Sequence, residues 1–298
     1  MVKGLPGRPP LNTGIIDSMK RPRLGKLLGV RPGEPVDLAS IDPASTPGFS
    51  GGRKRGRREV AELGGRLAEL HTRLHAASTQ GAADRILLVL QGIDCSGKDG
   101  VGRHVIGLLE PMWLRYAAFG RPTPEELQHD FLWRIRRQLP VAGQVGVFNR
   151  SHYEDVLVAR VHDLVPRPTW QRRYATINRF EEDLTADGVR LVKVMLHISA
   201  EEQRARLQSR LDDRAKQWKY NPGDVDERAF RPQYVAAYEA ALSRCSTAAA
   251  PWYVVPADHK WYRDWAVAHL LLGALEGIDP AYPPVGFDAD HERARLAT

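Results

Sequence analysis

The stretch that most constrains the fold of this chain runs from Arg85 to Gly100, with the sequence RILLVLQGIDCSGKDG. A run of aliphatic residues ends at Gly92, and after four further residues comes the pair Gly97-Lys98. An apolar pattern then resumes at Val101, Val105, Ile106, Leu108 and Leu109. This succession predicts a buried strand, a tight loop and a helix.

The pattern G-x-x-x-x-G-K between a strand and a helix is typical of a phosphate-binding loop. Backbone N–H groups of such a loop converge on the anion, the helix dipole adds positive potential, and the lysine reaches over the phosphates. A glycine turn followed by a surface lysine is the alternative, but it does not require the flanking strand and helix. We therefore expect these residues to bind phosphate: Gly92, Cys95, Ser96, Gly97, Lys98, Asp99 and Gly100.

Asp99 stands where phosphate-binding loops commonly carry a Ser or Thr that ligates Mg²⁺. Two interpretations stay open for it. An acid in the first turn of a helix is stabilised by the helix dipole, and a carboxylate here could also serve a metal.

The length, apolar content and cysteine count of the chain limit the kind of protein that it can be. The chain has 298 residues and enough apolar content for a full core, and its two cysteines, Cys95 and Cys245, provide no disulfide framework. No apolar run approaches the roughly 18 residues of a membrane span, and the N-terminal stretch lacks the apolar core of a signal peptide. We expect a cytoplasmic protein with no membrane partner.

The positive charge is concentrated at one end of the chain. Residues 1–58 carry 12 Lys and Arg against 4 Asp and Glu, whereas residues 59–298 carry 31 against 32, so the whole net charge of +7 comes from the first segment. That segment also holds eight prolines and the basic cluster 53–58. A nucleic-acid partner for the core is therefore not expected.

These shifts in composition predict three parts. Residues 1–58 are expected to form an extended basic arm, residues 59–278 a kinase-like domain, and residues 279–298 a tail without a motif. Met19 is an alternative start, so residues 1–18 could precede the native N-terminus.

The rest of the chain alternates strands with helices. Four further strands are predicted, at 114–119, 144–149, 191–198 and 252–256. Helices are predicted from Trp170 to Leu184, after the cap Ser199, from Asp226 to Leu242 and from Trp261 to Leu275. The expected fold is a three-layer α/β fold of the P-loop NTPase type, with a five-stranded parallel sheet and a helical lid.

A further helix is predicted after Pro122, where Thr123 and Glu126 form a capping box. Its buried stripe would consist of Leu127, Phe131, Ile135 and Leu139. Arg134 on this helix is either a substrate-positioning residue or part of a solvated charged face.

Polar residues gather where the strand 144–149 ends. In phosphate-loop folds the strand beside the loop carries a polar residue at its C-terminal end, next to the phosphates and the metal. Asn149 and Arg150 occupy that point, and Glu154 and Asp155 follow as a helix begins. An acidic pair in a first helical turn is ordinarily dipole complementation, but its position after this strand predicts a metal or substrate-positioning role.

A basic segment between residues 204 and 232 is typical of a lid. Such a mobile helical hairpin closes cationic side chains over phosphates and excludes water, whereas the alternative is an Arg-rich solvated helix. The cations are Arg204, Arg206, Arg210, Arg214, Lys216 and Lys219.

By these motifs the chain resembles the polyphosphate kinase 2 family, whose phosphate-loop enzymes move phosphoryl groups between inorganic polyphosphate and nucleotides. The resemblance covers about residues 38–275. The matching motifs are LQGIDCSGKDG, PTPEELQHDFLWR, FNRSHYEDVLVARVH, NRFEEDL, LHISAEEQRARLQSRLDD, KQWKYN and APWYVVPADHKWYRDW.

The resemblance implies that Asp94 and Lys98 handle Mg²⁺ and the transferring phosphate. It also implies that basic residues grip the polyphosphate chain, namely Arg150, Arg210, Arg214, Lys216 and Lys219. Asn149 stands where one branch of the family has an aspartate, and this variant looks like the branch that phosphorylates both AMP and ADP. The metal duty of the missing aspartate is then expected to pass to Asp155.

The expected catalytic residues are thus Asp94, Lys98, Arg150 and Asp155, with Mg²⁺ held by Asp94 and Asp155. Substrates would be polyphosphate and AMP, ADP or ATP, in a reversible reaction by a homo-oligomer, either a dimer or a tetramer. Cys95, at a helix N-terminus beside Lys98, is expected to carry an unusually acidic thiol. Two alternatives stay open, an ATP-dependent kinase of a small metabolite and a non-catalytic polyanion-binding protein.

Overall fold

The computed structural model describes residues 24–297, which contain one five-stranded sheet. All four strand pairs are parallel, and their spatial order is β2-β3-β1-β4-β5. The strands are β1 (Arg85–Gln91), β2 (Leu114–Ala118), β3 (Val145–Asn149), β4 (Val189–His197) and β5 (Trp252–Pro256). The predicted five-stranded parallel sheet is confirmed.

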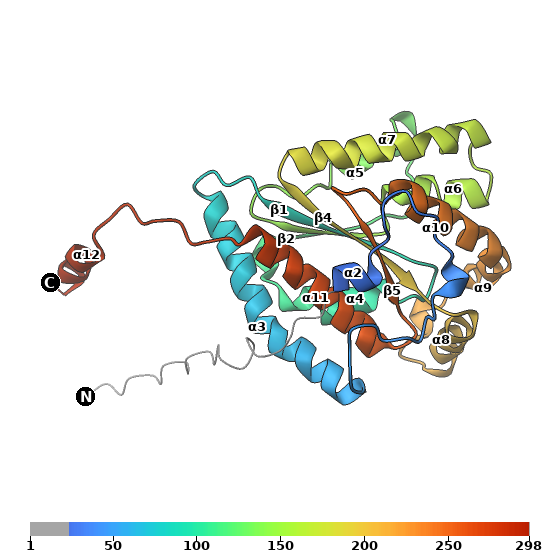
Figure 1. The fold of residues 1–298 in the computed structure, drawn as a ribbon, viewed down its shortest axis with the longest axis horizontal. Helices are drawn as coiled ribbons and strands as arrows, with labels where there is room; N and C mark the ends of the chain where they lie inside the picture. The colour runs from blue at the N-terminus through green and yellow to red at the C-terminus, as the bar shows by residue number, and fades with distance from the viewer. Residues whose placement is uncertain (1–23, 298) are drawn as a thin grey trace.

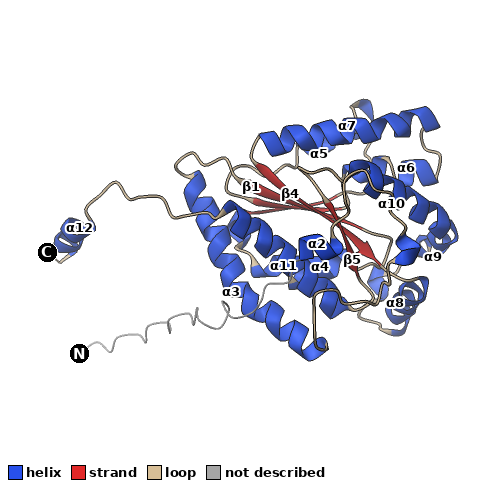
Figure 2. Cartoon of the chain, viewed as in Figure 1, coloured by secondary structure: helices blue, strands red, loops and turns tan. Residues whose placement is uncertain are grey.

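Helices cover both faces of the sheet, which forms the middle of three layers (Figures 1 and 2). One face packs against α3 (Arg53–Ser78), α4 (Lys98–His104) and α11 (Lys260–Ile278). The other face packs against α7 (Arg167–Ala186) and α10 (Arg231–Cys245). Each face therefore has its own apolar core. The strands β1, β3, β4 and β5 are largely buried, whereas the edge strand β2 is partly exposed.

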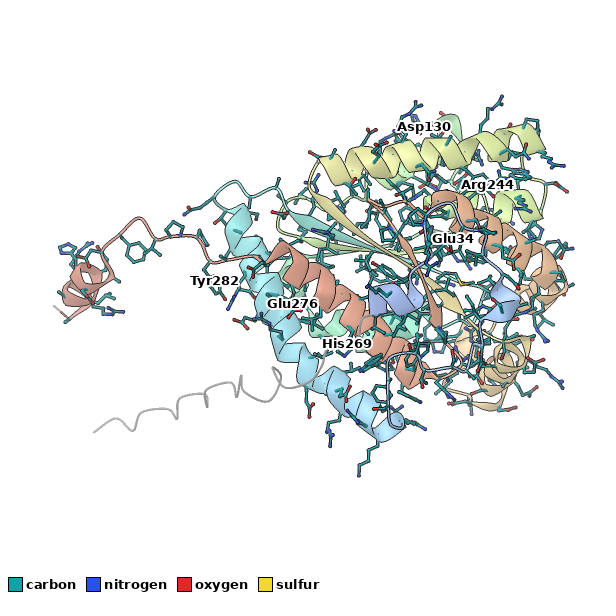
Figure 3. The ribbon with its side chains drawn as sticks, viewed as in Figure 1. Glu34, Asp130, Arg244, His269, Glu276 and Tyr282 are labelled. Carbon is teal, nitrogen blue, oxygen red and sulfur yellow. The ribbon has the colours of Figure 1, made fainter. Side chains whose placement is uncertain are left out.

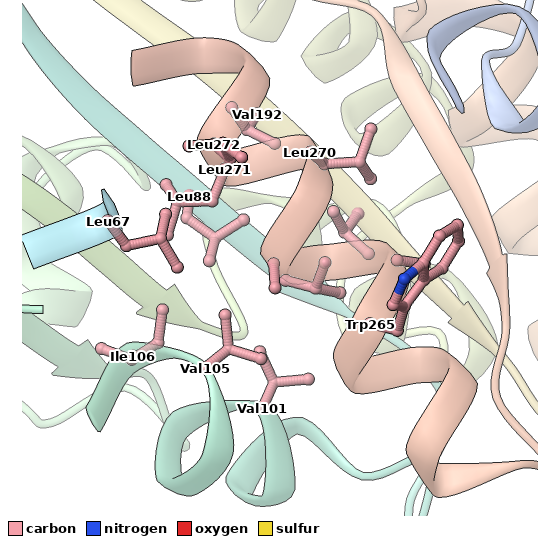
Figure 4. Close-up of a cluster of buried hydrophobic side chains, with 14 of the residues drawn as sticks. Leu67, Leu88, Val101, Val105, Ile106, Val192, Trp265, Leu270, Leu271 and Leu272 are labelled. Atoms are coloured by element: carbon pink, nitrogen blue, oxygen red, sulfur yellow. The ribbon is translucent and has the colours of Figure 1, made fainter. Parts of the chain in front are cut away.

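The alternation of side chains along β1 explains why its run of aliphatic residues is unbroken. Leu88 and its neighbours two residues away point into the core formed with α3, α4 and α11, where Leu67 and Leu271 lie close to it (Figure 4). Leu87 and Val89 point into the core on the other face. A strand with an apolar core on both sides needs apolar residues at every position.

The N-terminal segment differs from the extended arm that the composition predicts. Leu24 and Leu28, in α2 (Leu24–Leu28), and Leu38 are buried against the domain. The basic cluster 53–58 forms the first turns of α3, in which Arg55 pairs with the buried Glu59. This part of the segment folds because it carries apolar residues that the sheet can cover; residues 1–23 of the predicted arm lie outside the described part.

The predicted helix after Pro122 is broken into two short pieces, η4 (Glu126–Gln128) and α5 (Trp133–Arg136). The capping box is present, because Glu126 N–H donates to Thr123 Oγ1 at 3.2 Å. The Asp130 carboxylate then accepts a hydrogen bond from the N–H of Leu132 at 3.0 Å. This bond competes with the backbone bond that would continue the helix. Leu127 is consequently exposed (72%), so its predicted place in a buried stripe is wrong.

The helix after the phosphate loop is shorter than the apolar pattern predicts, because α4 ends at His104 and a short 3-10 helix, η2 (Ile106–Leu108), follows it. Ser199 caps α8 (Ala200–Asp212) as expected, since its hydroxyl accepts from Glu202 N–H. The remaining elements are η1 (Leu38–Ser40), η2 (Ile106–Leu108), η3 (Pro111–Trp113), η5 (His152–Asp155), α6 (Val158–Val161), α8 (Ala200–Asp212), η6 (Gln217–Lys219), α9 (Gly223–Asp226), η7 (Glu227–Phe230) and α12 (Ala289–Leu296).

After α11 the chain leaves the body of the domain, and α12 stands apart from it (Figure 1). Tyr282 lies where this segment passes α3, and the guanidinium carbon of Arg73 is 5.5 Å from its ring centroid (Figure 3). None of the helices between residues 24 and 297 combines the length and apolarity of a bilayer span.

Candidate active site

The loop between β1 and α4 turns sharply because Gly92, Cys95 and Gly97 all have positive φ, at 150°, 66° and 108°. A Cβ at Gly92 would lie 2.6 Å from Ser96 Oγ and 2.8 Å from a backbone oxygen of β4. A Cβ at Gly97 would collide with the guanidinium of Arg263, a buried residue of α11 that the sequence did not single out. Both glycines of the pattern are therefore required by close approach as well as by conformation.

Lys98 is the first residue of α4, and its side chain folds back over the loop. The ammonium donates to the carbonyl of Gly92 at 2.7 Å, and the residue is buried. Burial lowers the pKa of the ammonium, while the carboxylate of Asp94 opposes this effect. A cation held here by one carbonyl can exchange that contact for a phosphate oxygen.

Arg150 faces the loop from the end of β3. Its Nη2 donates to Asp94 Oδ1 at 2.8 Å, and its backbone N–H bonds to the carbonyl of Leu90 on β1. The residue adopts a left-handed conformation (φ 63°), which turns the chain away from the sheet directly after Asn149. Burial disfavours the guanidinium charge, but Glu154 and Asp94 outweigh it and hold the pKa of Arg150 above its usual value.

Glu154 belongs to the same cluster of charges. Burial raises the pKa of its carboxyl, and the cationic Arg150 and Lys98 oppose that rise. Asp94 also acts on it electrostatically. The structure therefore brings together four of the residues predicted from the sequence, at the carboxyl ends of the adjacent strands β1 and β3. They are the acidic Asp94 and Glu154 and the cationic Lys98 and Arg150.

Asn149 and Asp99 form a separate contact beside this cluster. The amide of Asn149 donates to Asp99 Oδ1 at 3.0 Å and to the hydroxyl of Tyr116 on β2 at 2.9 Å. The Asp99 carboxylate is thus held by the amide of Asn149, and it also lies in the first turn of α4, where the helix dipole favours negative charge. A cavity of about 400 Å³ opens next to it, lined by Asp99, Gly102, Ile106, Gly107, Leu109, Pro111, Leu114 and Tyr116.

Asp155 contacts two arginines, and its predicted role as a second metal ligand next to Asp94 stays a prediction. Its carboxylate is 3.0 Å from Arg173 Nη1 and 3.7 Å from Arg134 Nη2. Since adjacent residues of the turn η5 point in different directions, Glu154 faces the loop and Asp155 faces these arginines. Arg134 is itself buried and donates to the carbonyl of Gly120, so it is not part of a solvated face, and its substrate-positioning role stays a prediction.

The cations of the expected lid differ in their exposure to solvent. Arg214 and Lys216 are exposed, and Lys216 pairs with Asp213. Arg210 is partly buried, and its Nη1 donates to the carbonyl of Lys219 and to Asp224 at 3.0 Å. Arg206 differs from all of them, because it is buried behind the phosphate loop and does not face solvent.

The prediction of an acidic thiol at Cys95 is wrong. The residue is buried, and this burial raises the pKa of the thiol. Arg210 and Lys98 favour the thiolate, but they do not offset the desolvation and the nearby carboxylates. The thiol precedes the helix start at Gly97 and therefore gains little from the helix dipole.

A buried polar network supports the segment after β3, and the sequence interpretation missed it. Glu181 accepts from the hydroxyl of Tyr153 at 2.8 Å, lies 3.1 Å from His152 Nε2, and pairs with Lys193. All four side chains are fully buried. The sequence held two signs of this network. Lys193 interrupts the apolar run of β4, and Glu181 lies in the motif NRFEEDL; a buried charge requires a partner.

The carboxylates of the site suit a divalent metal ion that takes its remaining ligands from bound phosphates and water. Among residues 24–297 no group of three or more His, Cys, Asp or Glu side chains could hold a metal alone. Mg²⁺ in phosphoryl-transfer sites is bound by one or two carboxylates together with phosphates and water. Asp94 and Glu154 supply such oxygens, and the buried Gln91 Oε1 and Ser96 Oγ have no hydrogen-bond partner within the described chain.

The family model described as polyphosphate kinase 2 matches residues 51–282. A protein of Meiothermus ruber named AMP/ADP-polyphosphate phosphotransferase is 45% identical over 254 residues, which are 85% of this chain and 94% of that protein. A protein of Rhodopseudomonas palustris named ADP-polyphosphate phosphotransferase is 38% identical over 270 residues, or 87% and 92% of the two chains.

A solved structure agrees with these relatives. The crystal structure of polyphosphate kinase 2 from Arthrobacter aurescens TC1 is similar to this chain with a TM-score of 0.90 and 48% sequence identity, covering 93% of this chain and 97% of that one. The matches extend over the sheet, the phosphate loop and the segment after β3. This chain belongs to the polyphosphate kinase 2 family.

Proposed function

We propose that this protein is a Mg²⁺-dependent phosphotransferase that moves phosphoryl groups between inorganic polyphosphate and AMP, ADP or both. The observation that carries the proposal is the meeting of Lys98 and Arg150 with Asp94 and Glu154 at the phosphate loop. Cations and carboxylates so close together suit a site where phosphates and a divalent ion are bound together. Family membership supplies the polymeric donor and the nucleotide acceptor.

In this mechanism the protein acts by positioning and by neutralising charge, because phosphoryl transfer needs little covalent chemistry from the enzyme. N–H groups of the loop and of the first turn of α4 hold phosphate oxygens. Lys98 gives up its contact with the Gly92 carbonyl to reach the transferring group, and Arg150 stabilises the negative charge there.

Asp94 and Glu154 would hold the metal ion, which neutralises charge on donor and acceptor phosphates. This assignment replaces Asp155 with Glu154, because Glu154 shares the cluster with Lys98 and Arg150 while Asp155 is paired with Arg173. Arg210, Arg214, Lys216 and Lys219 are proposed to bind the polyphosphate chain. Arg214 and Lys216 are exposed, and Arg210 would exchange its contact with Asp224 for phosphate.

For the acceptor, we propose that both AMP and ADP are phosphorylated. The support is the relative of Meiothermus ruber, whose name includes both nucleotides. The resemblance links Asn149 to the branch of the family that acts on both nucleotides. The amide of Asn149 holds Asp99 in place, whereas an aspartate at this position would add a negative charge beside the phosphate loop. Since phosphoryl groups of nucleotides and polyphosphate are close in energy, the reaction is proposed to be reversible.

The test is analysis of nucleotide products after the purified protein is mixed with polyphosphate, Mg²⁺ and either AMP or ADP. We expect ADP and ATP from AMP, and ATP from ADP. The result that would contradict the proposal is transfer from ATP to a small metabolite with no use of polyphosphate. Binding of polyphosphate that weakens steeply with salt and yields no nucleotide product would instead indicate a polyanion-binding protein.

We further propose that the enzyme works in the cytoplasm as a homo-oligomer, either a dimer or a tetramer. Two buried free cysteines are compatible with a reducing compartment. The segment that carries α12 stands away from its own domain and exposes Val285 and Phe287, which a second copy could cover. Light scattering coupled to size-exclusion chromatography tests the subunit number, and a monomer at micromolar concentration would contradict it.

A further inference from the structure

Helix α8 runs behind the phosphate loop and binds three consecutive carbonyl groups of it. Gln203 Nε2 donates to the carbonyl of Asp94 at 3.2 Å. Arg206 Nη1 donates to the carbonyls of Cys95 at 2.9 Å and Ser96 at 3.0 Å. The loop is therefore held along its whole tight turn by two side chains from one face of α8.

Arg206 uses all its donors within the protein. Its Nη2 donates to the carbonyls of Ala257 at 2.6 Å and Asp258 at 2.9 Å, directly after β5. Its Nε donates to Glu202 at 2.7 Å, one turn earlier on α8. With two bonds from each terminal nitrogen and one from Nε, the five N–H groups of the guanidinium are all occupied, and the residue is only 8% exposed. Arg206 therefore has no donor left for a substrate phosphate.

The direction of these bonds fixes the direction of the loop's N–H groups. In a trans peptide the N–H points opposite to the carbonyl of the same peptide unit. When the carbonyls of Asp94 and Ser96 point toward α8, the N–H groups of Cys95 and Gly97 point away from it. The same bonds keep three carbonyl oxygens, which would repel a phosphate, out of the binding face of the loop.

The same helix also carries the start of the expected lid. Arg210 follows Arg206 by one helical turn, and it bonds to Lys219 and Asp224 in the segment between α8 and α10. Gln203 Oε1 in turn accepts from Arg231, at the start of α10. Both ends of the lid segment are thus linked to the residues that hold the loop.

We infer that Gln203 and Arg206 are positioning residues, which orient the peptide groups of the phosphate loop and couple that orientation to the lid segment. The inference rests on the proposed function for its catalytic consequence, but the orientation itself belongs to the loop and can be measured without turnover. Removal of Arg206 leaves the carbonyls of Cys95 and Ser96 without their donor, so the loop loses the arrangement that phosphate needs.

The variant that tests this is Arg206→Lys, because lysine keeps the positive charge but has three donors on one atom and cannot bind the loop and the end of β5 together. The matched control is Gln208→Ala, which removes an exposed side chain of the same helix that bonds to Asp212. We expect Arg206→Lys to lower kcat with polyphosphate by about 10²-fold and the control to stay within about 2-fold of the wild type.

Amide hydrogen exchange supplies a measurement independent of activity. In Arg206→Lys we expect faster exchange confined to residues 93–99, and loss of the protection that tripolyphosphate gives to this segment in the wild type. A second variant, Gln203→Leu, should show the same change to a smaller degree, because it removes one bond to the loop where Arg206 makes two.

Three outcomes would overturn the inference, and a fourth separates it from the proposed function. Wild-type exchange at residues 93–99 in Arg206→Lys would overturn it, and so would a kcat within about 2-fold of the wild type. Faster exchange spread over the whole domain would overturn it as well, because Arg206 would then act only on global stability. If the loop exchanges faster in the variant while the wild type makes no nucleotide from polyphosphate, the proposed function fails and the positioning role stands.

Discussion

Two segments form the site, the loop 92–98 after β1 and the segment 149–155 after β3, and they are held in place by different chemistry. The loop is bound through its backbone, by Gln203 and Arg206 and by close packing at its glycines. The segment after β3 is bound through its side chains, which join a fully buried network around Glu181.

The difference determines what each segment tolerates. A loop held by its carbonyls constrains the conformation at Cys95 and Ser96 more than the identity of their side chains. The other segment depends on particular polar groups at His152 and Tyr153, because each is buried against Glu181 and a buried charge without its partners is costly.

The largest expected effect is on the loop. Lys98→Ala removes the cation at its centre and Asp94→Asn removes the charge that pairs with Arg150, so each should lower kcat by about 10³-fold. Lys54→Ala, which changes an exposed lysine of α3, is the control and should leave kcat unchanged. Steady-state kinetics with polyphosphate and ADP, together with circular dichroism, measure this. Retention of a tenth of wild-type kcat by either site variant would refute its assignment.

The second prediction concerns the network behind the segment after β3. Lys193→Met leaves the Glu181 carboxylate buried without its cation and should lower the free energy of unfolding by about 3 kcal/mol. Adding Glu181→Gln should recover part of that loss, because the uncompensated charge is then removed. Urea unfolding of the two single variants and the double variant provides the measurement. Fully additive costs would mean that the two residues do not act as a pair.

The third prediction separates the two acids of the turn η5. Glu154→Gln should lower kcat by about 10²-fold, because Glu154 lies with Lys98 and Arg150. Asp155→Asn should keep kcat within about 3-fold but lower the free energy of unfolding by about 2 kcal/mol, since it weakens contacts with Arg173 and Arg134. Both quantities are measured for both variants, and the reverse pattern would restore Asp155 to the metal site.

The sequence predicted those features that depend on short-range patterns. The strands were found because a strand buried on both faces is a continuous apolar run, and the loop because its glycines are required at fixed spacing. The strand 144–149 was expected beside the loop, and β3 does pair with β1. Since the carboxyl ends of neighbouring parallel strands meet at one edge, Arg150 lies within hydrogen-bond distance of Asp94.

The features that could not be predicted depend on contacts between distant parts of the chain. Glu154 and Asp155 are adjacent acids, and only the arginines around Asp155 decide which one faces the loop. Arg206 belongs to a run of cations typical of a lid, and its burial follows from the packing of α8 against the loop and β5. The helix after Pro122 ends early because the Asp130 carboxylate accepts a hydrogen bond from the backbone N–H of Leu132.

The smallest expected effect concerns the thiol in the loop. Because burial raises the pKa of Cys95, its modification by iodoacetamide at pH 7.5 should be slower than that of glutathione and should rise with pH. Cys245, whose pKa burial raises to about 12, is an internal control and should react more slowly still. Mass spectrometry of the two cysteine peptides over time measures both rates. If Cys95 reacted faster than glutathione at pH 7.5, the loop would have to open and expose a thiolate. The backbone contacts from α8 would then be too weak to hold the loop closed, and the two segments would not differ in the way described above.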